Sequence, residues 1–434
     1  MSAILESPAP AAGPPERRAL PARRVPWLLV AVLASRLLVL GSGAAAALLT
    51  GRVAGWQFAD PTRLTQSFGR LGNVLLAASV RWDSLHYLSI AQQGYRPAAD
   101  TGFFPFYPLL IRALSTVLGS GVAAGLLISY TSLAIALTLL HRLTREELGR
   151  RAADATVLLL AFAPLSVFFS AIYTESLFLA LSVGTIYLAR RGHFAPACLT
   201  AACGTLTHAE GMVLFAPLAH LYWVRRGRPR SLRPLIDRQL AALCLPPLAL
   251  AGLSLYMRVQ GFGWLAWITG SHATGHGHSI APLSSGQTIF VRSFYGPLVT
   301  VWDAFTAGVT GLSQTLHGYP TVLPGVGDVF TIGFQNLVYL VVLVITLAAL
   351  YETWRRLPAV YAIYATFVVL LFTASVVAVI PLRAFDRYML PAFPLWMSAA
   401  GWLTQRRLLT GVLVLSALLS VFYTVEFSRW AMIA

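Results

Sequence analysis

Long apolar runs separated by short turns dominate the chain. A helix needs about 20 apolar residues to cross the hydrocarbon core of a bilayer, so most of these runs are candidate membrane spans. The runs at 194–207 and 209–224 are shorter, and predict tilted spans or a hairpin buried among other helices. The pattern as a whole predicts an all-α polytopic membrane protein with about eleven transmembrane helices. The candidate spans are 25–50, 121–141, 153–172, 175–190, 194–207, 209–224, 239–258, 329–350, 358–380, 389–404 and 408–425.

Clusters of arginine separate the spans and indicate how they are oriented. If all eleven spans form, the loop clusters fall on the side of the N-terminal arginines, which is cytoplasmic by the positive-inside rule. Residues 1–24 are then a disordered, Pro- and Ala-rich cytoplasmic tail, and residues 25–434 form the transmembrane domain, in the inner (plasma) membrane. The loop clusters are Arg142/Arg145/Arg150/Arg151, Arg190/Arg191, Arg225/Arg226/Arg228/Arg230, Arg355/Arg356 and Arg406/Arg407.

Two long segments, 51–120 and 259–328, are placed outside the cytoplasm by this topology. Both are too apolar and too aromatic for free loops. Amphipathic juxtamembrane helices lying in the outer interface account for that composition. We find no internal repeat, and no pair of matching interrupted helices of the kind that marks many transporters.

The composition excludes several classes of protein. Hydrophobic residues make up 57% of the chain and charged residues 11%, against about 25% charged in a soluble domain. An ordinary cytoplasmic enzyme, a disordered protein and a disulfide-rich scaffold are thereby excluded. All 32 basic residues are Arg, a usage typical of a GC-rich bacterial genome, and they form no basic stripe for nucleic acid. The three cysteines lie in apolar runs and are read as buried, inert thiols.

The few acidic residues on the predicted outer side are the candidates for carboxylate chemistry, because polar groups kept in such a chain are usually functional. The run from Ser84 predicts a short helix that ends near Gly94, and Asp83, just before it, shares a face with His86 and Tyr87. One interpretation of Asp83 is an N-cap. The other is a general base that accepts a proton from a hydroxyl nucleophile. The outer acidic residues are Asp60, Asp83, Asp100, Glu175, Glu210, Asp303, Asp328 and Asp386.

Four further charged residues have two or more interpretations. Glu175 begins an apolar span, where it stabilises the helix N-terminus or serves a function. Glu210 lies in a tight turn and caps it, pairs with an arginine or helps to bind a sugar. Arg383 and Arg387 are four residues apart and predict a same-face pair for a phosphate, while a surface pair with Asp386 is the alternative.

The remaining motifs give weaker evidence of function. The aromatic segment Phe103–Tyr107 is read as structural anchoring at the membrane interface. His272, His276 and His278 could bind a metal, but their glycines and the lack of a nearby carboxylate favour a mobile loop, so we predict no metal or other cofactor. No phosphate-binding Walker loop, dinucleotide fingerprint, HExxH or nucleophile elbow is present.

Three motifs resemble a known family. They are Arg81-Trp82-Asp83 with Ile90-Ala91 and Gly94-Tyr95, Phe103-Phe104-Pro105 with Tyr107-Pro108, and Tyr173-Thr174-Glu175-Ser176-Leu177-Phe178. In this order they resemble the PIG-V-type mannosyltransferases, the family of GPI mannosyltransferase 2 and its bacterial relatives.

The resemblance implies a C-type (GT-C) glycosyltransferase fold and a polyprenyl-phosphate-mannose donor. Transfer to a lipid or glycan acceptor at the outer face is implied, with inversion and with Asp83 as the catalytic base. Arg387-Tyr388 matches a late Arg-Tyr element of the family. Relatives usually carry Arg where this chain has His208-Ala209, which is a departure from the family pattern. The expected substrate- or donor-binding residues are Arg81, Trp82, His86, Tyr87, Glu175, His208, Glu210, Arg383, Arg387 and Tyr388.

A transporter or flippase of a lipid-linked sugar is the alternative function. Such a protein is expected to carry ionisable groups near the middle of the membrane, or repeat symmetry. In this chain the carboxylates fall at predicted helix ends instead, which favours the transferase. A catalytically silent scaffold is a third reading, which the Asp83 motif disfavours.

Overall fold

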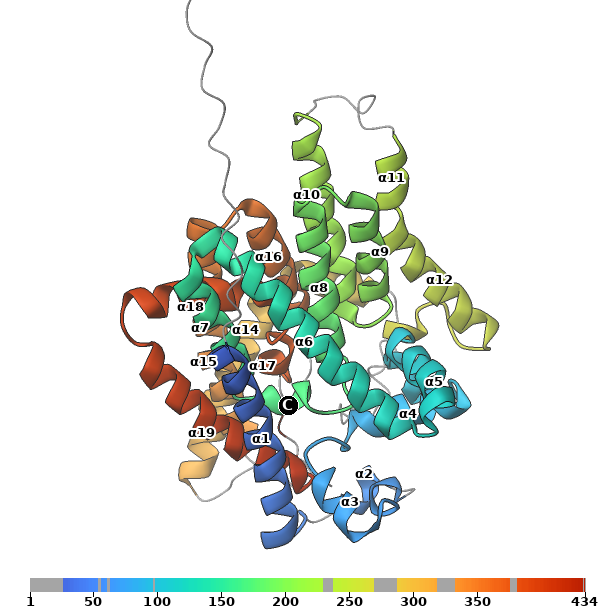
Figure 1. Ribbon diagram of the computed structural model, residues 1–434, viewed down its shortest axis with the longest axis vertical. Coiled ribbons are helices and arrows are strands. Elements are labelled where there is room, and N and C mark those ends of the chain that lie inside the picture. Colours follow the sequence, from blue (N-terminus) through green and yellow to red (C-terminus); the bar gives the residue numbers. More distant parts are fainter. Residues whose placement is uncertain are drawn as a thin grey trace, which may run out of the picture.

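The computed structural model describes residues 26–53, 56–60, 63–96, 98–228, 237–268, 287–317, 332–374, 381–431 and 433. Every regular element in these ranges is a helix, and the helices pack side by side in a bundle (Figure 1). The predicted all-α polytopic class is therefore confirmed for the part of the chain that is described. Among the described residues, five helices are long and apolar enough to cross a membrane: Trp27–Leu49, Gly121–Leu148, Arg238–Val259, Phe334–Arg356 and Leu409–Ser428.

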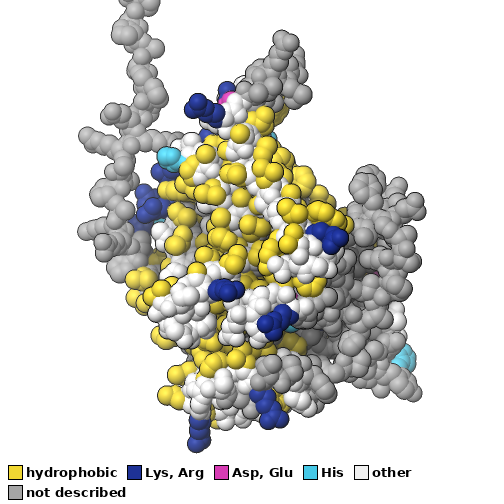
Figure 2. All heavy atoms as spheres, turned by 90° about the vertical axis from the view of Figure 1, so that its right-hand side faces the viewer, with side chains coloured by type: hydrophobic (Ala, Val, Ile, Leu, Met, Phe, Trp, Pro, Cys, Tyr) yellow, Lys and Arg dark blue, Asp and Glu magenta, His cyan; other side chains and the backbone are white. Residues whose placement is uncertain are grey.

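Most predicted spans coincide with helices because long apolar runs bury well in a bundle or in lipid. In Figure 2 a broad hydrophobic area lies between arginines near the top and arginines in the lower half of the molecule. The larger helices are α1 (Pro26–Leu49), α6 (Gly121–Leu148), α7 (Arg150–Ala161), α8 (Glu175–Arg190), α9 (Phe194–Thr205), α10 (Phe215–Arg225), α11 (Arg238–Leu243), α12 (Leu245–Val259), α15 (Ile332–Arg356), α16 (Ala359–Thr373), α18 (Phe393–Gln405) and α19 (Leu409–Ser428).

Short helices fill the segment between α1 and α6, as predicted for residues 51–120. They gather at the lower end of the bundle in Figure 1. This end holds the candidate site. The elements are α2 (Trp56–Ala59), η1 (Leu64–Gln66), α3 (Gly69–Leu75), α4 (Asp83–Gln93), η2 (Ala98–Gly102) and α5 (Phe106–Leu118).

The segment 259–328 contains a long helix that the hydropathy pattern missed. This helix, α14 (Gln287–Leu316), packs along α15. A Cβ added to Gly308 would lie 2.9 Å from Leu337, so the two helices approach closely. Pro297 and Asp303 interrupt the apolar run, and sequence alone therefore indicated only juxtamembrane helices here.

The predicted span 153–172 is broken in the structure. α7 ends at Ala161, and an irregular, buried stretch with the short helix η3 (Ser166–Phe169) leads to α8. Arg36 on α1 donates to the carbonyl oxygens of Ala161, at 2.5 Å, and Ser166, at 2.9 Å. Buried backbone away from water needs partners within the protein. Arg36 therefore stabilises the irregular stretch of backbone that leads from α7 to Glu175.

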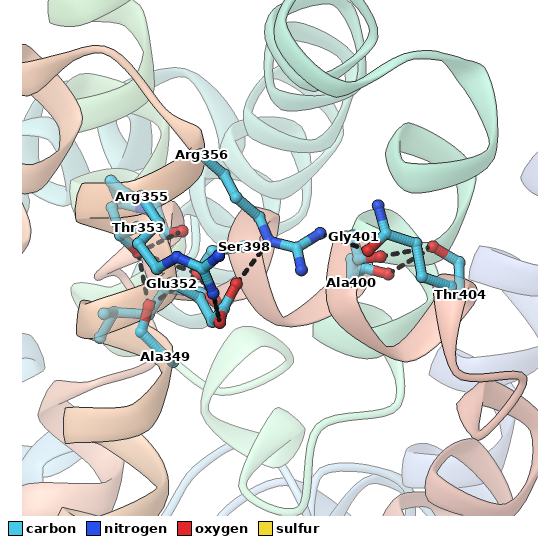
Figure 3. A network of polar contacts seen from close by, with 12 residues as sticks. Ala349, Glu352, Thr353, Arg355, Arg356, Ser398, Ala400, Gly401 and Thr404 are labelled. Carbon is cyan, nitrogen blue, oxygen red and sulfur yellow. Dashed lines mark hydrogen bonds and ion pairs between the residues drawn. The ribbon is translucent and has the colours of Figure 1, made fainter.

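A polar network ties α15 to α18 at their C-terminal ends (Figure 3). Glu352 accepts hydrogen bonds from Arg355 at 3.1 Å and Arg356 at 2.5 Å. Arg356 also donates to the side chain of Gln405 on α18 at 2.7 Å. These arginines belong to a cluster that is predicted to be cytoplasmic, and their partners Glu352 and Gln405 lie at the C-terminal ends of α15 and α18.

Candidate functional site

Asp83, Glu175 and Arg387 form one buried ionic cluster, which we call the triad. Arg387 Nη1 lies 2.9 Å from Asp83 Oδ2, and Arg387 Nε donates to Glu175 Oε1. The side chains come from the starts of α4 and α8 and from the short helix α17 (Phe385–Tyr388). All three residues are buried, and Asp83, at 8% exposed, is more accessible than Glu175, at 1%. Two carboxylates thus share a single guanidinium.

Asp83 is not an N-cap, so that interpretation is wrong. The cap position of α4 is Trp82, which has a φ of 51°, and Asp83 lies in the first turn. A positive φ is costly for a bulky residue, and such strain is often found at functional sites. The carboxylate of Asp83 is directed to Arg387. The prediction that Gly94 ends the helix is confirmed, with a φ of 73° at the C-cap.

Aromatic rings enclose the guanidinium of Arg387. The rings of Phe168 and Tyr173 have their centroids 4.8 Å from its central carbon, and Tyr388 lies at 5.8 Å. The Tyr173 hydroxyl also accepts a hydrogen bond from the backbone N–H of Asp83 at 3.2 Å. Sequence reasoning assigned no role to Phe168 or Tyr173. The Tyr173-Thr174-Glu175 motif was the available signal for Tyr173.

The predicted same-face pair of Arg383 and Arg387 is not formed. α17 has only four residues, and Ala384, with a φ of 59°, separates it from Arg383. Asp386, the partner in the alternative surface pair, accepts a hydrogen bond from the backbone N–H of Arg387 at 2.8 Å. Burial raises the pKa of the Asp386 carboxyl to about 7.

Glu210 and His208 lie beside the triad. Glu210 is fully buried, and neither of its oxygens has a hydrogen-bond partner among the described residues. His208 Nδ1 is 3.8 Å from Glu210, and the His208 ring stacks on Phe178 and meets the edge of Tyr388. Burial, with a smaller contribution from Arg387, lowers the pKa of His208 to about 3, so the imidazole is neutral at pH 7.

The remaining predicted site residues make contacts within the protein. His86 Nδ1 lies 2.8 Å from Asp100, and the Tyr87 hydroxyl lies 3.3 Å from that of Thr174. Arg81 donates to the carbonyl oxygen of Ser428 at 3.2 Å. They brace α4 and thereby position Asp83.

The aromatic segment after α4 is largely buried within the protein. Phe103, Phe104 and Tyr107 are buried in a hydrophobic cluster with residues of α4 and α6. The Tyr107 hydroxyl bonds Ser129 at 2.8 Å.

A largely apolar cavity of about 370 Å³ lies between α4, α5 and α12. It begins at the C-terminal half of α4, the helix whose first residue is Asp83. Arg112 is the charged residue among those that line it. The lining residues are Ile90, Ala91, Gly94, Tyr95, Pro105, Pro108, Leu109, Arg112, Leu206, Ala249, Gly252, Leu253 and Tyr256.

Within the described ranges, no three His, Cys, Asp or Glu side chains lie close enough together to hold a metal ion. His272, His276 and His278 lie outside the described residues. Of the cysteines, Cys198 is buried, but Cys203 is partly exposed and Cys244 is exposed, so the prediction of buried thiols is wrong for Cys244.

These observations define a multi-span membrane protein with a buried ionic site at one end of its bundle. The family model for the mannosyltransferases (PIG-V) matches residues 20–224, which include Asp83, Glu175, His208 and Glu210. The resemblance to PIG-V-type mannosyltransferases is thus confirmed for this part of the chain.

Curated relatives show the same resemblance. GPI alpha-1,6-mannosyltransferase 2 of Cricetulus griseus is 31% identical over 213 residues, 44% of this chain and 42% of the relative. GPI mannosyltransferase 2 of Yarrowia lipolytica is 32% identical over 150 residues, 33% of this chain and 41% of the relative. The match therefore spans less than half of either relative. Among solved structures, ArnT from Cupriavidus metallidurans bound to undecaprenyl phosphate has a TM-score of 0.47 and 12% identity, covering 94% of this chain and 76% of that one.

Proposed function

We propose that the protein is an integral-membrane glycosyltransferase of the GT-C type. It moves mannose from a polyprenyl-phosphate-mannose donor to a lipid or glycan acceptor at the outer face of the membrane. The observation that carries this proposal is the triad, which combines a carboxylate able to accept a proton with a guanidinium able to bind a phosphate.

The reaction that these groups support is a direct displacement. Asp83 takes the proton of the acceptor hydroxyl, whose oxygen attacks the anomeric carbon of the donor sugar. The bond from that carbon to the phosphate oxygen breaks, and Arg387 stabilises the departing phosphate. A single displacement inverts the anomeric centre, so a β-linked donor yields an α-mannoside.

The outer end of the bundle is the end that holds the triad. This orientation follows from the arginine clusters at the opposite ends of the helices. A cysteine placed at the exposed Ser67, in a variant without native cysteines, is then expected to react with an impermeant thiol reagent in intact cells. Protection of this cysteine until the cells are permeabilised would reverse the orientation.

We assign the polyprenyl chain of the donor to the cavity between α4, α5 and α12. The cavity is mostly apolar, and Ile90 and Ala91 line it near the C-terminal end of α4, the helix whose first residue is Asp83. Gly252 lines it, and a Cβ added there meets no heavy atom within 4 Å. A larger residue at this position is therefore accommodated by the fold but occupies the cavity.

Gly252→Leu is expected to raise the KM for a long-chain donor about tenfold, since displacing about two methylene groups costs ~0.8 kcal/mol each. The KM for a donor with a very short chain should not change. Gly411→Leu is the matched control, because Gly411 on α19 also has open space around it and lies away from the cavity. A raised KM for the acceptor alone would assign the cavity to the acceptor lipid instead.

Transfer is tested with the purified protein in proteoliposomes that contain radiolabelled polyprenyl-phosphate-mannose and a crude extract of membrane lipids and glycans. We expect the label to leave the donor and to become covalently attached to an acceptor. Movement of labelled donor across the bilayer without covalent transfer would support the flippase and contradict the transferase.

A further inference from the structure

The proposed base and the proposed phosphate ligand are bonded to each other in this structure. Asp83 Oδ2 lies 2.9 Å from Arg387 Nη1. A carboxylate paired with a guanidinium accepts a proton less readily, because the nearby positive charge favours its ionised form. A guanidinium occupied by carboxylates has in turn fewer N–H groups for a phosphate. The bond between them therefore weakens Asp83 as a base and occupies an N–H group of Arg387 that could bind a phosphate.

Two edges of the Arg387 guanidinium are used differently. Its Nε is bonded to Glu175, while Nη1 is bonded to Asp83. Phosphates and carboxylates bind the same donor forks of arginine. Asp83 is the more exposed of the two carboxylates, at 8% against 1% for Glu175. A ligand that reaches the triad therefore meets the Asp83 edge of the guanidinium first.

The guanidinium itself is poorly placed to move. The rings of Phe168 and Tyr173 flank it, and Glu175 holds Nε from a fully buried position. Asp83, by comparison, has a short side chain in the first turn of α4. When a phosphate competes for the Nη edge, Asp83 is the group that gives way.

We propose that the donor phosphate displaces Asp83 from Arg387, so that the catalytic base is released only when donor is bound. Glu175 remains on Nε as a positioning residue and keeps the guanidinium aimed at the phosphate. This inference rests on the proposed function. It makes binding ordered, with the donor preceding activation of the acceptor hydroxyl.

The formal charge of the triad works against the binding of a phosphate. One arginine and two carboxylates carry a formal charge of −1, which opposes a phosphate. Asp83→Asn and Glu175→Gln each remove one negative charge. If charge alone mattered, both would tighten phosphate binding equally. If Asp83 and the phosphate compete for one edge, only Asp83→Asn frees that edge from a charged competitor.

The experiment measures the Kd of undecaprenyl phosphate for the full-length protein in nanodiscs. We expect Asp83→Asn to bind it about tenfold more tightly than wild type, since one charge-assisted hydrogen bond no longer has to be broken. Glu175→Gln should change the Kd by less than about twofold, since it leaves the competing Asp83 bond in place. Asp83→Ser is a second variant of the same kind, and thermal unfolding establishes that each variant is folded.

Failure of the proposed competition and failure of the proposed function give different results. Equal or weaker binding by folded Asp83→Asn and Asp83→Ser, with binding abolished in Arg387→Lys, would overturn the competition and leave the phosphate site at Arg387. Wild-type binding by Arg387→Lys would remove the phosphate from Arg387 and with it that part of the proposed function. Equal tightening by Asp83→Asn and Glu175→Gln would reduce the effect to charge and also overturn the inference.

Discussion

Replacing Asp83 with Asn is expected to abolish most of the transfer activity while the protein remains folded. The Asn side chain has the same size, and its amide oxygen can still accept a hydrogen bond from Arg387. It cannot accept a proton at neutral pH. General-base assistance is worth ~10²–10⁴-fold in rate, so we expect kcat to fall at least ~10²-fold. The measurement is the rate of label transfer from polyprenyl-phosphate-mannose at saturating donor.

Asp60→Asn is a suitable control for this substitution. Asp60 is also a buried acid at the same end of the bundle, but its oxygens accept hydrogen bonds from the backbone of Leu64 and Thr65. The amide oxygen of Asn can replace one of these acceptors but its NH2 group cannot replace the other, so Asp60→Asn is expected to lose some stability and still transfer mannose at nearly the wild-type rate. If Asp83→Asn is also close to wild type, Asp83 is not the base, and Glu175 and Glu210 are the next carboxylates to test.

Replacing Arg387 with Ala should destabilise the protein as well as prevent donor binding. The change leaves the buried carboxylates of Asp83 and Glu175 close together without a counterion. Removing one partner of a buried ion pair typically costs about 3–5 kcal/mol. The midpoint of thermal or denaturant unfolding measures this loss, with no donor present.

Two further variants separate stability from function at Arg387. Arg387→Lys keeps the positive charge but loses the planar fork, so it should retain much of the stability and still bind donor poorly. The triple variant Arg387→Ala, Asp83→Asn, Glu175→Gln removes the uncompensated charges and should regain stability without activity. An Arg387→Ala protein as stable as wild type would show that the triad contributes nothing to folding.

The sequence by itself determined the class of protein and most of its helices. The predicted span 175–190 coincides with α8. The predicted span 194–207 extends two residues beyond the end of α9, and α16 lies within the predicted span 358–380. This succeeds because hydropathy is a local property and a helix in lipid satisfies its own backbone. The motifs around Asp83 and Glu175 also indicated the resemblance to the PIG-V mannosyltransferases, whose family model matches residues 20–224.

Only the tertiary structure decided which charged residues meet. Sequence spacing placed Arg383 with Arg387 and gave a helix cap as one of two interpretations of Asp83, whereas packing pairs Arg387 with Asp83 and Glu175. Likewise, Arg36 in an apolar run gave no signal of the irregular backbone that it supports. A buried charge must find its partner wherever the fold brings one, because leaving it unpaired in the interior is costly. That partner can lie 212 residues away, as Glu175 does from Arg387, at a distance that no local pattern encodes.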